Sequence, residues 1–223
     1  MTLTYKKIYI LTSGDAAKEL ENLIINEIGN NEWSVGGFID DFFLKNNKKK
    51  KLILFNKKYK IFKFSEVKNK KKSYAVVNTT NIRKKDSLFK KIKKKFKIPI
   101  LIHPNTEISK FAKIKKGSII MSGSKIKFNS VINENVFINT NVVVGHDTVI
   151  GKNSFVGNSV IFNGKCKIGS NCLIGSGAIF HPGVKIGSNC KISMGSVVTE
   201  DLKSNSKLLS INRSMVLKNY EKK

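Results

Sequence analysis

Several residue types and patterns are scarce in this chain, and each scarcity narrows its class. Three cysteines among 223 residues, with no CxxC pair, predict neither a disulfide framework nor a cysteine zinc site. No apolar run approaches the roughly 20 residues that a membrane span requires. Lys6 and Lys7 precede only the apolar run at residues 8–11, which is too short for a signal sequence. We therefore expect a cytoplasmic protein with no membrane span and no metal.

Acidic residues are also scarce, because 15 Asp and Glu stand against 42 Lys and Arg, a net charge of +27. The basic excess is concentrated in residues 42–97, which hold 22 basic and 2 acidic side chains. The lysine runs there lack regularly spaced stacking aromatics, so nucleic-acid binding is not favoured. A solvated lysine surface is the simplest interpretation. A non-catalytic, lysine-rich scaffold that binds polyanions stays open as an alternative.

The chain does contain a period of six residues. Every sixth residue from Ile102 to Val198 is aliphatic or Phe, and the residue four places further on is usually small. This period fits neither an α-helix nor an alternating strand, but it is typical of hexapeptide β-helices, in which three hexads make one coil. We expect residues 98–203 to form a left-handed parallel β-helix and residues 204–223 to form a C-terminal tail. The flat outer faces of such a prism predict a homotrimer.

The first 97 residues have a different pattern. Apolar strands are expected at residues 7–11, 35–39 and 73–77. Apolar residues at helical spacing follow the first strand at residues 16–28 and the third strand at residues 82–96, and residues 42–72 read as an exposed hairpin or loop region. This β-α-β alternation predicts a small α/β domain of the Rossmann-like, nucleotide-binding type over residues 1–97.

Among the three histidines, His146 has the surroundings that acyl transfer requires. It falls at a corner of the predicted coil and is followed by Asp147, which could orient the ring. Three hexads further on, and hence one full coil above, lies Gly164, whose backbone N–H can approach a ligand closely. A general base beside a free N–H donor suits a tetrahedral oxyanion intermediate. The spacing alone is equally compatible with a surface histidine beside a turn glycine.

A zinc hydratase built on a β-helix is a further candidate class, and the histidines do not favour it. Such an enzyme needs three histidines that converge on one metal ion. The separation of His146 and His181 is one position short of two coils, and no His-x4-His pair is present. His103 reads as a polar cap at the start of the β-helix, and His181 as a solvated corner residue.

Five segments resemble the NeuD/PglD family of bacterial sugar acetyltransferases, in the same order along the chain. They are Gly-Phe-Ile-Asp-Asp at 37–41, Ile-His-Pro at 102–104, Asn139, Val-Gly-His-Asp at 144–147, and Asn-Gly-Lys-Cys-Lys-Ile-Gly at 163–169. The resemblance implies an acetyltransferase that uses acetyl-CoA and has its active sites between subunits. The implied acceptor is the amino group of a nucleotide-linked amino sugar in surface-glycan biosynthesis. O-acetylation of a sialic-acid-type sugar is the close alternative.

The resemblance also implies roles for individual residues. His146 would be the general base, with Asp147 as its partner, Asn139 nearby, and the Gly164 N–H as the oxyanion donor. Acetyl-CoA would lie near Gly164 and along the groove formed by Ser176, Gly177, Met194 and Gly195. The nucleotide sugar would be held in the N-terminal domain by Ser13, Gly14, Asp40 and Asp41.

Three places depart from the family's pattern. The glycine-rich turn after the first strand is Thr-Ser-Gly-Asp-Ala at residues 12–16, where Asp15 would repel a phosphate. Phe155 stands where some relatives have a second histidine. The tail motif reads Ile-Asn-Arg-Ser at residues 211–214, which changes the expected tail contacts to CoA.

Overall fold

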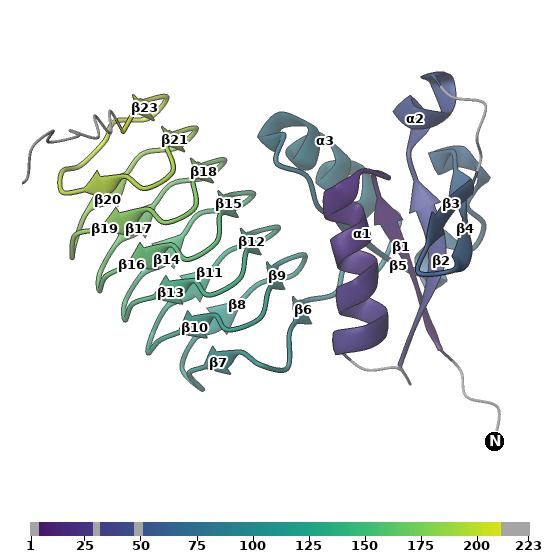
Figure 1. Ribbon diagram of the computed structural model, residues 1–223, viewed down its shortest axis with the longest axis horizontal. Coiled ribbons are helices and arrows are strands. Elements are labelled where there is room, and N and C mark those ends of the chain that lie inside the picture. Colours follow the sequence, from purple (N-terminus) through teal and green to yellow (C-terminus); the bar gives the residue numbers. More distant parts are fainter. Residues whose placement is uncertain (1–4, 29–31, 47–50, 211–223) are drawn as a thin grey trace, which may run out of the picture.

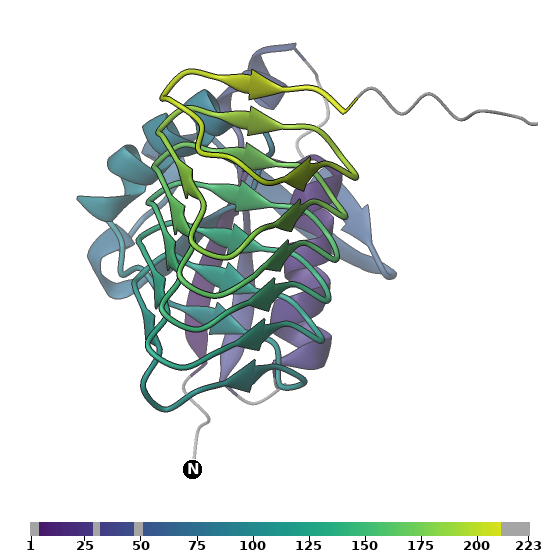
Figure 2. The same cartoon turned by 90° about the vertical axis from the view of Figure 1, so that its left-hand side faces the viewer.

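A computed structural model describes residues 5–28, 32–46 and 51–210, which form an α/β domain beside a triangular β-helix (Figure 1). Figure 2 looks onto the β-helix, with the α/β domain behind it. The tail motif at residues 211–214 lies outside the described residues.

The α/β domain is built on a five-stranded sheet with the order β3-β4-β2-β1-β5. Its strands are β1 (Lys6–Leu11), β2 (Trp33–Ile39), β3 (Lys51–Leu54), β4 (Lys57–Phe62) and β5 (Tyr74–Val77). The helices are α1 (Asp15–Asn22), which continues into a π-helical turn (Leu23–Glu27), α2 (Asp41–Asn46) and α3 (Ile82–Lys93). Short 3-10 turns cover Phe64–Glu66 and Lys70–Lys72. The predicted Rossmann-like pattern of strands and helices is confirmed.

Residues 42–72 match the expected exposed hairpin or loop region only in part. They contain a hairpin, because β3 pairs antiparallel with β4. However, β4 also pairs parallel with β2, so it belongs to the central sheet. Ile61 of β4 is accordingly buried, while most lysines of the hairpin are exposed. The helix α2 within this region had no periodic signal, since it is only six residues long.

The hexad repeat forms three faces of a left-handed parallel β-helix. Face 1 consists of β6 (Leu101–Ile102), β9 (Ile119–Ile120), β12 (Phe137–Ile138), β15 (Phe155–Val156), β18 (Leu173–Ile174), β21 (Lys191–Ile192) and β23 (Lys207–Leu208). Face 2 consists of β7 (Glu107–Ile108), β10 (Lys125–Ile126), β13 (Val143–Val144), β16 (Ile161–Phe162), β19 (Ile179–Phe180) and β22 (Val197–Val198). Face 3 consists of β8 (Lys113–Ile114), β11 (Val131–Ile132), β14 (Val149–Ile150), β17 (Lys167–Ile168) and β20 (Lys185–Ile186).

The second residue of each strand points into the prism, as the hexad predicts. Val144 and Phe162 are register partners on neighbouring coils, and both are fully buried. Phe162 also stacks on Phe180 with ring centroids 4.7 Å apart. The small residues of the hexad close the corners, where Cys166, Cys172 and Cys190 are buried and free. Because every inward residue stacks on its equivalent in the next coil, the core is one continuous column.

The end of the β-helix lies beyond the expected boundary at residue 203. Strand β23 continues face 1, and its Lys207 pairs with Lys191. A complete coil of three hexads would instead bring Leu209 beside Lys191, so this last coil is shorter than the others. The hexad frame therefore stops while the β-helix continues.

The α/β domain is packed against face 1. Leu101, Ile119 and Phe137 of that face share a buried cluster with Ile8, Leu20 and Ile24 of the domain. Next to this cluster, Lys85 of α3 is buried and its Nζ donates a hydrogen bond to the Asn135 carbonyl. Burial lowers the pKa of Lys85 to about 7. The packing fixes the domain beside the coils and leaves faces 2 and 3 uncovered by it.

Candidate active site

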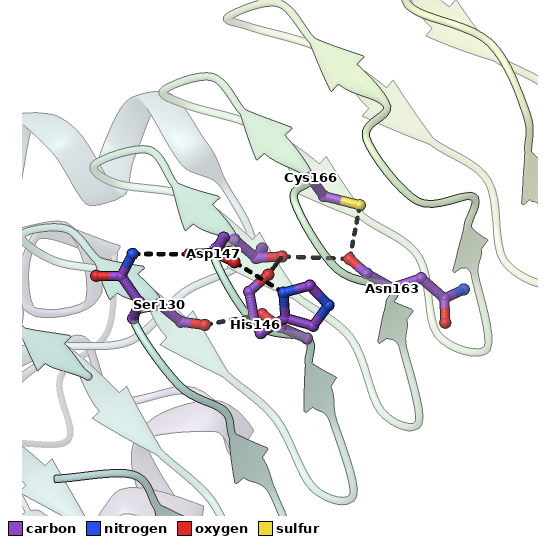
Figure 3. Close-up of polar contacts among 8 residues, drawn as sticks. Ser130, His146, Asp147, Asn163 and Cys166 are labelled. Atoms are coloured by element: carbon purple, nitrogen blue, oxygen red, sulfur yellow. Dashed lines mark hydrogen bonds and ion pairs between the residues drawn. The ribbon is translucent and has the colours of Figure 1, made fainter. Parts of the chain in front are cut away.

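His146 lies at the corner between faces 2 and 3, which we call the His146 corner and define as residues 145–148 and their equivalents in neighbouring coils. The corner turns because Asp147 adopts a left-handed backbone with φ of 57°. Small polar residues hold it, since Ser130 Oγ donates to the Gly145 carbonyl at 2.8 Å and Thr148 Oγ1 to the Asn163 carbonyl at 3.2 Å (Figure 3). The small slot of the hexad therefore satisfies carbonyl groups that the coil itself leaves unpaired.

The imidazole of His146 is oriented by a carboxylate. Its Nδ1 lies 2.8 Å from Asp147 Oδ2, and Asp147 Oδ1 accepts a hydrogen bond from Asn129 Nδ2 at 2.7 Å. These two hydrogen bonds, that of His146 first, lower the pKa of Asp147. The carboxylate thus stays ionised and favours the tautomer with the proton on Nδ1. The other ring nitrogen, Nε2, is left free to accept a proton from a substrate.

Gly164 lies directly over the imidazole. A Cβ built on Gly164 would come within 2.3 Å of His146 Nε2, a contact that only glycine avoids. The spacing between the coils is held by Lys165 N, which donates to the His146 carbonyl at 2.8 Å. The Gly164 N–H itself has no acceptor among the described residues. The 18-residue spacing in the sequence therefore correctly predicts that Gly164 lies over His146, with its backbone N–H beside the ring.

An open cavity of about 670 Å³ surrounds this pair. Its wall adds Phe128 and Pro182, which lie one coil below His146 and one coil above Gly164, together with Lys127 and Lys165. No motif in the sequence marks these four residues. The same coil spacing would have found them, because positions 128, 146, 164 and 182 form one column and the two lysines are their sequence neighbours.

Of the residues expected to contact acetyl-CoA, Gly164 lies at the His146 corner. Ser176, Gly177, Met194 and Gly195 lie at a different corner, between faces 1 and 2, which we call the Met194 corner. Gly177 stacks beneath Gly195, and Met194 is 72% exposed. Asn139 lies at this corner too, where its Oδ1 accepts a hydrogen bond from Thr140 N. The structure therefore does not bring Asn139 to His146. The two residues are separated by one hexad plus one position, so Asn139 belongs to the preceding corner of the triangle.

A second cavity, of about 490 Å³, lies at the carboxyl ends of β1, β2 and β5 in the α/β domain. It brings together Ser13, Gly14 and Asp40. Asp40 Oδ2 accepts hydrogen bonds from the N–H and Oγ of Ser13 at 3.0 and 2.9 Å, and its Oδ1 accepts one from Phe43 N. The carboxyl ends of parallel strands are the usual ligand side of such sheets.

Asp41 does not line this cavity. Its Oδ1 accepts a hydrogen bond from Phe64 N at 2.7 Å, and its Oδ2 lies 3.0 Å from Lys91 Nζ. Burial raises the pKa of Asp41, but the hydrogen bonds from Phe64 and Lys91 outweigh it, and the pKa is lowered. These contacts with Phe64 and Lys91 give Asp41 a structural role away from the cavity.

Two further findings concern ligands and membranes. Within the described ranges, no group of three or more His, Cys, Asp and Glu side chains is arranged to hold a metal ion. No helix in the same ranges is long and apolar enough to cross a membrane.

The fold and the repeat together define a hexapeptide β-helix protein. Residues 129–164 and 165–200 match the family model for the bacterial transferase hexapeptide (six repeats). These residues are therefore hexapeptide repeats of the bacterial transferase type. A comparison with curated proteins finds no match.

Several solved structures share the whole two-domain architecture. The acetyltransferase domain of PglB from Neisseria gonorrhoeae, in complex with acetyl coenzyme A, superposes with a TM-score of 0.80 at 20% identity, covering 92% of this chain and 96% of that one. A mutant perosamine N-acetyltransferase from Caulobacter crescentus, in complex with CoA and GDP-perosamine, gives 0.81 at 22% identity, covering 95% and 97%. WeeI from Acinetobacter baumannii gives 0.74 at 19% identity, covering 95% and 100%. The chain has the fold of these proteins from the first domain to the last coil.

Proposed function

We propose that this protein is an acetyltransferase that moves the acetyl group of acetyl-CoA to a sugar, with the amino group of a nucleotide-linked amino sugar as acceptor. One observation carries the proposal: His146, held by Asp147 at 2.8 Å, lies beneath Gly164, whose N–H is unpaired in the described chain. The complexes of similarly folded proteins with acetyl coenzyme A, CoA and GDP-perosamine support the choice of substrates.

The geometry supports direct transfer without an acyl-enzyme. The acceptor amine would attack the thioester carbonyl while His146 Nε2 takes its proton. The Gly164 N–H would hold the oxyanion of the tetrahedral intermediate. Its collapse breaks the C–S bond, and the CoA thiolate leaves and receives the proton. Asp147 keeps the ring in the correct tautomer and stabilises the imidazolium that forms between the two steps.

We also propose a homotrimer with the active sites between subunits. Faces 2 and 3 are left uncovered by the α/β domain, and Ile179 and Val197 of face 2 are 39% and 67% exposed. His146 and Met194 lie at the two edges of face 2, so a neighbour packed there would bring a second set of corners to each edge. A monomeric mass in sedimentation equilibrium would contradict this assembly.

Two other functions remain to be distinguished. A hydroxyl acceptor would use the same base and oxyanion donor, so an O-acetyltransferase fits the same site. A non-catalytic scaffold would need neither the His146–Asp147 pair nor the glycine over it, and both are present with close geometry. The site therefore favours an enzyme over the scaffold.

The test is a thiol-release assay with acetyl-CoA and a panel of nucleotide-linked amino sugars and sialic acid. His146→Ala should lower kcat by roughly 10²–10⁴-fold, the range for the loss of a general base. His181→Ala is the matched control, because His181 is exposed and forms no carboxylate pair in the described structure. Full turnover in His146→Ala would refute the mechanism. Retention on heparin with no acetyl-CoA binding would instead support the scaffold.

A further inference from the structure

One residue of the His146 corner differs in kind from its equivalents. From residue 117 to residue 195, every sixth residue adopts the left-handed backbone that closes a corner. Glycine, Asn, Asp and Ser fill all of these positions except one, Lys165, with φ of 67°. Gly, Asn and Asp visit this conformation readily, whereas a long side chain adopts it at a conformational cost. Such an exception beside a candidate active site suggests a functional reason.

The backbone of Lys165 lies beside the candidate catalytic residues. It follows Gly164 directly, its N–H is bonded to the His146 carbonyl, and it lies one coil above Asp147. Its side chain lines the cavity around His146 together with Lys127, and none of the residues that line this cavity is Asp or Glu. The cavity wall is therefore positively charged.

Ion pairs in the described structure do not neutralise the positive charges of Lys127 and Lys165. Lys127 Nζ lies 3.4 Å from Glu107 Oε2, a carboxylate that Lys125 also contacts at 2.9 Å. Lys165 has no ion pair among the described residues. Both oxygens of Asp147 are engaged, with His146 and Asn129. The charge of Lys165 makes only the smallest contribution to the lowered pKa of Asp147, and the two side chains form no ion pair in the described structure.

We propose that Lys165, assisted by Lys127, binds an oxyanion group, phosphate or carboxylate, of the substrate held over His146. This inference rests on the proposed function and adds a specificity residue to it. A lysine ammonium on a flexible stem suits such a group as a point charge, and a charge-assisted hydrogen bond is stronger than a neutral one. The anionic group belongs either to CoA or to the acceptor, and both sources present the same chemistry to the lysine.

The test is Lys165→Asn, which installs the residue type found most often at the other corners and should leave folding intact. KM for the anion-bearing substrate should rise about tenfold, with kcat changed less than twofold and the effect reduced by added salt. Lys152→Asn is the matched control, because Lys152 is an exposed lysine at another corner. It should leave both constants unchanged.

The substrate arms identify the source of the anion. If the 3′-phosphate of CoA is the anion, the rise in KM caused by Lys165→Asn disappears with 3′-dephospho-acetyl-CoA. If the CoA diphosphate is the anion, the rise in KM persists with that donor and also with a neutral amino sugar. If the acceptor supplies it, the effect appears with nucleotide-linked or carboxylate sugars and disappears with a neutral amino sugar. Unchanged KM values for every substrate would overturn the inference. A lowered kcat with an altered pH profile at constant KM would also overturn it, because that result indicates that Lys165 acts through Asp147.

Failure of the proposed function gives a different result. Wild-type protein that releases no thiol with any acceptor refutes the acetyl transfer. In that case calorimetry with CoA and with inorganic pyrophosphate still tests Lys165 by itself. Weaker binding of either probe by Lys165→Asn supports the anion site, and equal binding by wild type and variant overturns it.

Discussion

Replacement of Gly164 by alanine is the sharpest perturbation that the structure offers. The added Cβ would lie 2.3 Å from His146 Nε2, 2.7 Å from Cε1 and 2.8 Å from Cδ2. Ordinary contacts to Cβ begin near 3.4 Å, so the ring must move by about 1 Å. A misplacement of this size at a catalytic group costs about 10²-fold in rate. Gly164 has no left-handed φ, so alanine should not strain the backbone. We expect kcat in the thiol-release assay to fall about 10²-fold with the free energy of unfolding unchanged or slightly increased.

Gly183→Ala is the control with the opposite expectation. Gly183 has open space around its Cβ position but a left-handed φ of 80°. Alanine there should lower the free energy of unfolding by about 1–2 kcal/mol while kcat stays near the wild-type value. If Gly164→Ala retains kcat within a few-fold of wild type, the close approach of Gly164 to His146 has no catalytic meaning and the reasoning fails.

Two further predictions concern charged groups. Asp147→Asn should fold normally, because Asn adopts the same left-handed backbone at several other corners, including Asn129 one coil below. It should lower kcat about 10- to 100-fold by removing the charge that orients and supports the imidazole. An unchanged kcat would show that Asp147 is only a corner residue. Lys85→Met should abolish a pH dependence of stability. The pKa of Lys85 is lowered from 10.5 to about 7 in the folded state, so between these values the unfolded state binds more protons and stability rises with pH. Below pH 7 the folded state carries the full cost of burying the charged ammonium, at most about 3–5 kcal/mol. The urea midpoint of wild type should therefore rise relative to that of Lys85→Met between pH 6 and pH 10. The same difference between the two urea midpoints at pH 6 and at pH 10 would contradict the lowered pKa of Lys85.

Much of the candidate site could be predicted because the hexad repeat has a constant length. Three hexads separate stacked positions, so the sequence alone pairs His146 with Gly164. The same spacing would also have excluded Asn139 from that corner and added Lys165 to it. Asp41 could not be judged in this way, because its neighbours, Phe64 and Lys91, come from segments with no periodic relation to it.

By itself the sequence determined the β-helix, its corners and the stacking of His146 beneath Gly164, since each follows from short-range periodicity and local backbone preference. Only the tertiary structure decided that the α/β domain lies on face 1, that β4 joins the central sheet, and that a last short coil follows residue 203. Those outcomes depend on packing between segments far apart in the chain, which for example brings Leu20 and Phe137 into one buried cluster and Lys85 to the Asn135 carbonyl. No period in the sequence records such contacts, because they depend on the complementary shape and charge of two separately formed surfaces.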